Sequence, residues 1–378
     1  MKSIYFDNAA SAPMLESVVQ SMSQVLMEMT GNPSGTHKHG RKCRAAIEKS
    51  RKSIAENFNA SIGEIFFTSG GTESNNTALN CSVDQYGVQR IITTPIEHPS
   101  VLNTLSFLKT KRGIQVEFLA VDNMGRIDLA ELENKINAQN DRTLVSIMHA
   151  NNEIGVINPI AEIGEICKSN NILFHTDAVQ TVGHLPIDLN SMYISFLSAS
   201  GHKFHGPKGI GFLYVNSNNI IQPFINGGSQ ERNVRGGTEN LAGIVGMAEA
   251  LEYCKNNLDK KRQHVVALRQ YFIEKIKTAL PPTVKIMSME DPEDCLYTIL
   301  NIMVPQTAKS DLLLMNLDIA GISASGGSAC SSGAEKGSHV IGAITNNKQA
   351  GKSVRFSFSF LNTTEEVSQT IEVLKKSL

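Results

Sequence analysis

The residues Ser198-Ala199-Ser200-Gly201-His202-Lys203-Phe204-His205-Gly206-Pro207-Lys208-Gly209 form a glycine-rich turn directly after the apolar run from Tyr193 to Leu197. A buried strand that ends in such a turn is typical of a sheet that binds ligands at the carboxyl ends of its strands. The turn can hold an amine at a fixed point while backbone N–H groups and hydroxyls face an anion. Lys203 in this position suits Schiff-base chemistry with a phosphate-bearing aldehyde, for which pyridoxal phosphate is the obvious candidate. A surface turn with a solvated lysine is an equally good interpretation of this stretch alone.

Strand-like and helix-like segments alternate around this turn, through the first two-thirds of the chain. Short apolar runs predict strands at residues 64–68, 90–94, 144–149, 172–176, 194–198 and 210–215. Helical patterns between them cover residues 72–83, 99–109 and 160–168. The alternation predicts an α/β fold in which a mostly parallel sheet lies between helices.

The last third of the chain has a different pattern. Residues 238–277 are helical with a soft break near Asn256, and strands at 297–303 and 354–358 then alternate with helices at 309–319 and 364–378. This mixture predicts a smaller α+β domain. We therefore expect a large cofactor-binding domain of residues 14–255 and a small domain of residues 1–13 and 256–378.

The composition excludes several classes of protein. The 35 Lys and Arg residues nearly balance the 36 Asp and Glu residues, so nothing requires a nucleic acid or an acidic membrane as partner. The basic run from Arg41 to Lys52 fits the solvated face of a helix. No apolar stretch is long enough to span a bilayer and the N-terminus lacks a signal-peptide pattern, so we expect a cytoplasmic protein. The six cysteines include no Cys-x-x-Cys pair, which argues against a zinc site or a disulfide framework.

The run from Phe67 to Asn76 joins a predicted strand to a helix through Gly70 and Gly71. The glycines let the backbone approach a ligand closely, and the first N–H groups of the helix would form an anion site with the Thr72 hydroxyl. An ordinary helix N-cap is the commoner explanation of such a run.

Asp177 lies at the end of another apolar strand. A buried carboxylate is costly unless it is paired, and a pyridinium nitrogen is a suitable partner because a protonated ring stabilises a neighbouring carbanion. Gln180 could then reach the phenolic oxygen of the ring. The alternative is that Asp177 caps the helix that follows it.

His98 follows a third strand, in Glu97-His98-Pro99-Ser100. An imidazole there could stack on a planar ring and relay protons near neutral pH, although a lone histidine after a strand is usually structural. The other residues predicted at the same edge of the sheet favour a functional role for His98. The residues at predicted strand ends on one edge of one sheet are Thr72, His98, Asn152, Asp177 and Lys203.

Cys330 lies among Gly, Ser and Ala residues, in the loop from Ser323 to Gly333. We expect an exposed and mobile thiol, which is how a thiol that attacks one partner and delivers to another is mounted. A free surface cysteine is the alternative. Arg355 lies on a strand-like segment, where its guanidinium suits an α-carboxylate, with a structural ion pair as the other interpretation.

With these residues assembled, the chain resembles the cysteine desulfurases of the NifS-like family, within the class V aminotransferases of pyridoxal-phosphate fold type I. The resemblance runs almost from end to end. It is carried by Tyr5-Phe6-Asp7-Asn8-Ala9-Ala10, Gly31-Asn32-Pro33-Ser34, the run from Thr68 to Asn76, Thr94-Pro95-Ile96-Glu97-His98, Asn151-Asn152-Glu153-Ile154-Gly155, His175 with Asp177 and Gln180, Ser200-Gly201-His202-Lys203, Gly227-Gly228-Ser229-Gln230-Glu231, Gly237-Thr238-Glu239-Asn240, Gly327-Ser328-Ala329-Cys330 and Arg355-Phe356-Ser357.

The resemblance implies how the cofactor ring is held. Lys203 would carry the internal Schiff base, Asp177 would hold the pyridine nitrogen and His98 would stack on the ring. Gln180 and Asn152 would contact the ring oxygen or the substrate.

It also implies how the phosphate and the substrate are bound. The phosphate ligands would be Gly71, Thr72, Ser200 and His202, joined by Thr238 from a partner subunit, so that the enzyme would be a homodimer. Arg355 would bind the carboxylate of L-cysteine. Two positions depart from the family pattern: Ser359 stands where glycine is usual, and Gly71 stands where alanine is common.

The activity that the resemblance implies is conversion of L-cysteine to L-alanine. Lys203 would remove the Cα proton, and the Cys330 thiolate would attack the substrate sulfur and become a persulfide. His98 or a group of the substrate could take the thiol proton. An acceptor protein for iron–sulfur cluster assembly or thiolation would then receive the sulfur. No intrinsic metal site is expected, beyond a transient iron–sulfur contact of Cys330 with a scaffold partner.

Two kinds of alternative remain at this point. One is a different enzyme on the same fold, an aminotransferase or a selenocysteine lyase, although an aminotransferase has no need for Cys330. The other is a sulfur-carrier or interaction protein with a vestigial cofactor site.

Overall fold

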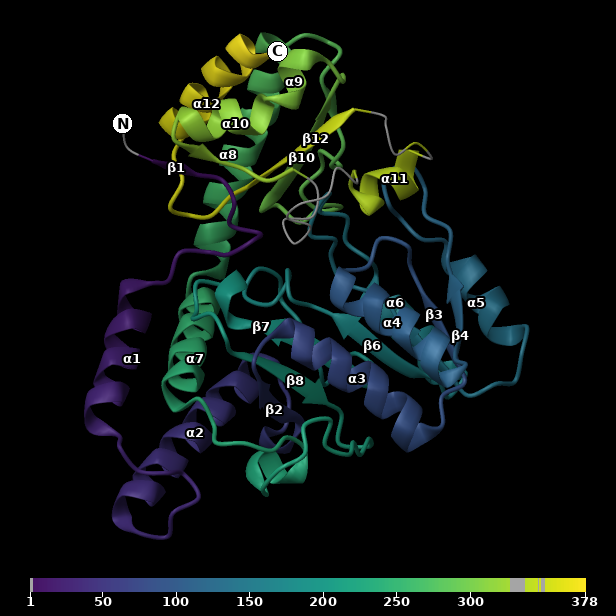
Figure 1. Ribbon diagram of the computed structural model, residues 1–378, viewed down its shortest axis with the longest axis vertical. Helices are drawn as coiled ribbons and strands as arrows, with labels where there is room; N and C mark the ends of the chain where they lie inside the picture. Colours follow the sequence, from purple (N-terminus) through teal and green to yellow (C-terminus); the bar gives the residue numbers. More distant parts are fainter. Residues whose placement is uncertain (1–2, 327–336, 346, 348–350) are drawn as a thin grey trace.

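The computed structural model describes residues 3–326, 337–345, 347 and 351–378 (Figure 1). Cys330, which we expect on an exposed and mobile loop, lies outside the described residues. No helix formed by the described residues is long and apolar enough to cross a membrane.

A seven-stranded sheet forms the centre of the molecule, in the order β2-β8-β7-β6-β5-β3-β4. Its strands are β2 (Ile65–Thr68), β3 (Arg90–Thr93), β4 (Gln115–Phe118), β5 (Thr143–Ser146), β6 (Leu173–Asp177), β7 (Phe196–Ser200) and β8 (Gly211–Val215). Only β8 runs antiparallel to its neighbours, so the predicted mostly parallel sheet is confirmed. The connection from β7 to β8 spans residues 201–210 and is too short for the crossover that parallel neighbours require.

Both faces of this sheet are buried, because successive side chains of a strand point to opposite faces. In β3, Ile91 packs with one face and Ile92 with the other. The helices over the first face, in front of the sheet in Figure 1, are α3 (Gly71–Tyr86) and α4 (Pro99–Arg112). The helices packed into the core on the opposite face are α1 (Glu16–Glu28), α2 (Lys38–Asn57), α5 (Leu129–Asn137), α6 (Ile160–Ser169) and α7 (Leu241–Asn256).

A second, smaller unit lies above the central sheet in Figure 1. Its antiparallel sheet has the order β12-β10-β9, and a separate pair of strands joins β1 to β11. These strands are β1 (Ile4–Tyr5), β9 (Lys285–Ile286), β10 (Ile299–Val304), β11 (Ile322–Ser323) and β12 (Lys352–Ser357). The helices are α8 (Leu258–Ala279), α9 (Ala308–Asp311), α10 (Leu313–Ile319), α11 (His339–Thr345) and α12 (Thr364–Ser377).

The N-terminal residues pack with the C-terminal third of the chain. Ile4 and Phe6 belong to the same hydrophobic cluster as side chains of α8, β10 and β12, and the Phe6 ring meets Phe356 and Phe358 edge to face. The soft break predicted near Asn256 is confirmed, because α7 ends there and α8 begins at Leu258. The domain boundaries after residues 13 and 255 stay a prediction.

One expectation about the basic run of α2 is wrong. Arg51 does not lie on the solvated face: its side chain is 1% exposed and its guanidinium binds both carboxylate oxygens of Glu231, at 2.7 and 2.8 Å. It also lies over the ring of Phe67 in β2. Burial is tolerated because the charge is paired, and that pairing joins residues far apart in sequence, which no local pattern reveals.

Candidate active site

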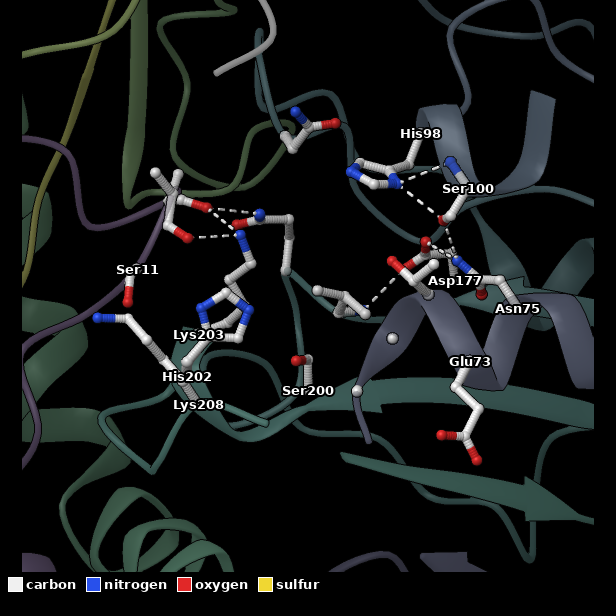
Figure 2. A pocket seen from close by; sticks show the side chains of 18 of the residues that line it. Ser11, Glu73, Asn75, His98, Ser100, Asp177, Ser200, His202, Lys203 and Lys208 are labelled. Atoms are coloured by element: carbon white, nitrogen blue, oxygen red, sulfur yellow. Dashed lines mark hydrogen bonds between the residues drawn. The ribbon is translucent and has the colours of Figure 1, made fainter. Parts of the chain in front are cut away.

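A cavity of about 450 Å³ lies at the carboxyl ends of the parallel strands (Figure 2). The predicted site residues that line it are Gly71, Thr72, His98, Asn152, Asp177, Gln180, Ser200, His202, Lys203 and Arg355. Side chains from the ends of β2, β3, β5, β6 and β7 therefore meet where the topology predicts. Thr238 does not line the cavity in this chain, and Cys330 falls outside the described residues.

One wall of the cavity is the N-terminus of α3, at Gly71 and Thr72. The first N–H groups of a helix have no partner within it, and they attract anions. Gly70 has a φ of 150°, a conformation that other residues rarely adopt. A Cβ on Gly71 would lie 2.5 Å from Val179 Cγ2, so the packing of Val179 against this turn favours glycine.

His202 lies on the neighbouring wall with Ser200 and Lys203. Burial, together with the charges of Lys203 and Lys208, lowers the pKa of His202 to about 4, so the imidazole is neutral near pH 7. Its Nδ1 is buried and makes no hydrogen bond within the described part of the chain. A neutral imidazole beside the helix N-terminus of α3 suits an anion such as a phosphate.

Lys203 points toward the N-terminal segment of the chain (Figure 2). Its Nζ donates hydrogen bonds to the carbonyl oxygens of Ala9, at 2.6 Å, and Ala10, at 2.9 Å. Gln180 Nε2 donates to the same Ala9 oxygen at 3.0 Å. The amine and the glutamine are thus both placed by a backbone segment nearly two hundred residues earlier.

Asp177 lines the cavity, and its side chain also accepts a local hydrogen bond in the turn after β6. No helix lies between β6 and β7, so the alternative of a helix cap is wrong, and the pairing with a pyridinium nitrogen stays a prediction. Asp177 Oδ1 accepts from Val179 N–H at 3.0 Å, and its Oδ2 accepts from Asn75 Nδ2 at 2.6 Å. The carboxylate is 6% exposed. Its partners on both oxygens keep it oriented at the floor of the cavity.

His98 is the N-cap residue of α4. Its Nδ1 accepts from Ser100 N–H at 3.1 Å and lies 2.8 Å from Ser100 Oγ. Burial lowers the pKa of the His98 imidazole, Lys203 and His339 lower it further, and Asp177 raises it. The net effect favours a neutral ring.

Arg355 is buried and joins the two parts of the molecule. Its Nη2 pairs with Asp7 Oδ1 at 2.8 Å, and its Nη1 donates to Asn152 O at 2.8 Å. The predicted structural ion pair is therefore present. The guanidinium also lines the cavity, and its Nε has no hydrogen-bond partner among the described residues.

The segment that follows the undescribed residues 327–336 is anchored beside the cavity. His339 Nε2 lies 3.0 Å from the carbonyl oxygen of Glu97, and Ser338 Oγ donates to the carboxylate of Glu153. Glu97 and Glu153 directly adjoin His98 and Asn152 in sequence. The chain is therefore attached beside the site at Ser338 and His339.

Thr238 follows the segment from Gln230 to Gly237, which is attached to the N-terminus of α3. Arg235 pairs with Glu73 in the first turn of α3, with Nε to Oε1 at 3.0 Å. Burial raises the pKa of Glu73, but hydrogen bonds from Arg235 and Ser69 outweigh burial and hold that pKa below its usual value.

Sequence reasoning missed several residues that shape the site: Asp7, the carbonyls of Ala9 and Ala10, Asn75 and Ser100. Asn75 lies one helical turn after Gly71 and Thr72, on the side of α3 that meets the sheet, and that spacing was the one available signal. No group of three or more His, Cys, Asp and Glu side chains in the described ranges could hold a metal ion.

Comparisons with known proteins agree with this geometry. The family model described as aminotransferase class-V matches residues 4–370. The chain is 41% identical to a protein named cysteine desulfurase IscS from Dictyoglomus turgidum, over 99% of this chain and 94% of that protein. Among solved structures, a NifS-like protein superposes with a TM-score of 0.91 at 35% identity, over 99% of this chain and 98% of the other. A structure of SspA in complex with cysteine superposes with a TM-score of 0.82 at 33% identity, over 96% and 100% of the two chains.

These matches span the whole of both units of the fold, and the cavity lined by Lys203, Asp177 and His98 lies within the matched region. The chain belongs to the class-V aminotransferase family and, within it, to the cysteine desulfurases.

Proposed function

We propose that this protein uses pyridoxal phosphate to convert L-cysteine to L-alanine and transfers the sulfur to Cys330 as a persulfide. The observation that carries the proposal is that an amine, a carboxylate and an imidazole line one cavity, from Lys203, Asp177 and His98. The cysteine bound in the related SspA structure supports L-cysteine as the substrate.

The residues of the cavity fit this cofactor. His202 Nδ1 is a buried polar atom without a partner in the described part of the chain, and the N-terminus of α3 at Gly71 and Thr72 borders the same cavity. Gly71, Thr72, Ser200 and His202 would hold the phosphate, Asp177 the pyridine nitrogen, and Gln180 and Asn152 the ring oxygen or the substrate. When bound, the cofactor supplies an electron sink that stabilises the carbanion formed at the substrate Cα.

Lys203 would link to the cofactor and, once displaced by the substrate amine, would take the Cα proton. The Ala9 and Ala10 carbonyl oxygens accept hydrogen bonds from Nζ and would hold the resulting ammonium group. Arg355 would bind the substrate carboxylate, because it lines the cavity and a guanidinium suits a carboxylate.

The sulfur transfer would be a displacement at the substrate sulfur. The Cys330 thiolate would form an S–S bond as the Cβ–S bond of the substrate breaks. The electron pair of the broken bond passes to Cβ, which gains a proton and becomes the methyl group of alanine. Such an attack requires a thiolate on a segment that reaches the cavity, and the anchoring of Ser338 and His339 at the rim supports that reach.

We further propose a homodimer in which Thr238 of one subunit completes the phosphate site of the other. Thr238 is exposed and does not line the cavity of its own chain, which leaves its hydroxyl available to the site of a second subunit. The persulfide sulfur would go to an acceptor protein of iron–sulfur assembly or thiolation.

The test is to supply purified holoenzyme with L-cysteine and a dithiol reductant and to measure alanine and sulfide together. Lys203→Ala should form neither product and should lose the absorbance of the linked cofactor. Cys330→Ser should still change the cofactor spectrum on adding L-cysteine but release no alanine. Cys81→Ser is the matched control, because burial raises the pKa of that thiol to about 12 and it should stay inert.

Two outcomes would contradict the proposal. One is an added sulfur on a cysteine other than Cys330 in the mass spectrum, with Cys330 unmodified. The other is transfer of the amino group to an added 2-oxo acid without release of sulfide, which would identify an aminotransferase.

A further inference from the structure

A continuous chain of hydrogen bonds connects Asp177 to His98 across the floor of the cavity (Figure 2). Asn75 Nδ2 lies 2.6 Å from Asp177 Oδ2 and 2.9 Å from Ser100 Oγ. Ser100 Oγ in turn lies 2.8 Å from His98 Nδ1. Asn75 and Ser100 are both buried, at 1% and 8% exposure, so water does not compete for these bonds.

The direction of each bond follows from the chemistry of its ends. An ionised Asp177 accepts only, so the Asn75 atom facing it must be the amide nitrogen. That nitrogen carries a second hydrogen, which it donates to Ser100 Oγ. The Ser100 hydroxyl hydrogen is then available for His98 Nδ1, the remaining acceptor of the chain.

In a second hydrogen bond His98 Nδ1 is again the acceptor, and the donor and acceptor of this bond cannot exchange roles. Ser100 N–H donates to His98 Nδ1 at 3.1 Å because His98 is the N-cap of α4. A hydroxyl can rotate to accept, but a backbone N–H can only donate. His98 Nδ1 therefore keeps its lone pair, and the single proton of the neutral ring lies on Nε2.

The opposite edge of the ring borders the reaction space. His98 lines the cavity, and Figure 2 shows its Nδ1 edge turned to Ser100 and its other ring nitrogen turned away from Ser100, on the side where Lys203 lies. The charged and titratable groups that act on the ring are Asp177, Lys203 and His339. A neutral ring with this orientation presents a hydrogen-bond donor to whatever the cavity holds.

We propose that Asn75 and Ser100 are positioning residues that hold His98 as the neutral Nε2–H tautomer, so that His98 meets the bound substrate or cofactor as a hydrogen-bond donor rather than as a base. This inference rests on the proposed function for what the cavity binds. It replaces the expectation that His98 takes the thiol proton. A base at the cavity edge would need a lone pair on Nε2, which requires the proton on Nδ1, where two donors already point.

The tautomer can be measured directly by nitrogen NMR of the holoenzyme labelled with ¹⁵N-histidine, with His98→Gln to assign the signal. The expected result at neutral pH is a protonated Nε2 and an unprotonated Nδ1 in the His98 ring, both with and without L-cysteine analogues that cannot react. A protonated Nδ1 in the neutral ring, or a ring that carries both protons at neutral pH, would overturn the proposal.

Variants separate positioning from a merely structural role. Ser100→Ala removes the hydroxyl donor, and Asn75→Ala frees Ser100 Oγ to accept from Nδ1–H. Each should raise the population of rings protonated on Nδ1 by roughly fivefold, the scale of one net hydrogen bond. Thr104→Val is the matched control, because it removes a hydroxyl one turn further along α4. The single proton of that hydroxyl is shared between Asn76 Oδ1 and the Ser100 carbonyl oxygen, and it takes no part in the hydrogen bonds between Asp177 and His98.

If the population of His98 rings protonated on Nδ1 rises no more in Ser100→Ala and Asn75→Ala than in Thr104→Val, the positioning roles are wrong. The wild-type spectrum alone decides the tautomer if Asn75→Ala fails to fold. The NMR result does not depend on turnover, so a protein that releases no alanine from L-cysteine would refute the proposed function and leave the tautomer assignment standing.

Discussion

Both oxygens of Asp177 accept hydrogen bonds from donors that cannot reverse, one from a backbone N–H and one from an amide nitrogen. An asparagine offers one acceptor atom in place of two, so Asp177→Asn leaves one of these donors without a partner. It also removes the negative charge that would hold a protonated pyridine nitrogen. We expect Asp177→Asn to bind some cofactor through the N-terminus of α3 and to lose about 3 kcal/mol or more of transition-state stabilisation, a fall in kcat of over about a hundredfold.

The measurement is the rate of alanine release at saturating cofactor. Asp188→Asn is the matched control, since Asp188 caps a nearby turn through Asn190 N–H and does not line the cavity. A turnover number of Asp177→Asn equal to that of the control would mean that another carboxylate serves the ring.

The packing of α3 against the turn after β6 explains the glycine at position 71. An alanine is the better helix former, by up to about 1 kcal/mol, but its Cβ would lie 2.5 Å from Val179 Cγ2. Overpacking of this kind costs about 1 to 3 kcal/mol. We therefore expect Gly71→Ala to lower the thermal stability of the protein and to weaken cofactor binding, because the first turn of α3 must move.

The double variant Gly71→Ala with Val179→Ala tests the cause. It removes the Val179 methyl groups that the new Cβ would meet, so cofactor affinity should return toward that of the wild type. If Gly71→Ala binds the cofactor as tightly as the wild type, then Gly71 and Val179 do not pack as closely as the structure shows.

At the scale of the whole molecule, Arg51 and Glu231 connect α2 to the segment that precedes Thr238. Glu231, Arg232 and Asn233 all have positive φ values, from 42° to 66°, which are unfavourable for residues other than glycine. The paired carboxylate of Glu231 also accepts from Phe67 N–H in β2, at 2.8 Å. This buried pair thus holds a strained segment against β2, the strand that leads to the N-terminus of α3.

Arg51→Met should therefore cost about 3 to 5 kcal/mol of unfolding free energy, because it leaves the Glu231 charge buried without its partner. Urea unfolding measures the loss. Lys52→Met is the matched control on the same helix, since the Lys52 side chain is 68% exposed and its ion-pair partner Glu56 is also exposed. Equal losses in the two variants would show that the buried pair contributes nothing beyond a surface contact.

Much of this architecture is predictable from local pattern. Short apolar runs separated by helical periods predicted the strands β2, β3, β5, β6, β7 and β8 within a few residues, because a strand buried on both faces must be apolar throughout. Polar residues directly after those strands predicted the cavity, because parallel strands end at one edge of a sheet. The partly exposed strand β4 was missed because it has no continuous apolar run, and α1 was missed although its sequence is amphipathic.

The sequence by itself determined the α/β fold and the identity of Lys203, Asp177, His98 and Arg355 as candidates, since those depend on residue type and on position along a strand. Only the tertiary structure decided what surrounds them. The carbonyls of Ala9 and Ala10 that hold Lys203 carry no side-chain signature, and the Asn75 and Ser100 bonds between Asp177 and His98 join three separate elements. Contacts between distant segments depend on how the layers pack, and such packing leaves no periodic trace in the chain.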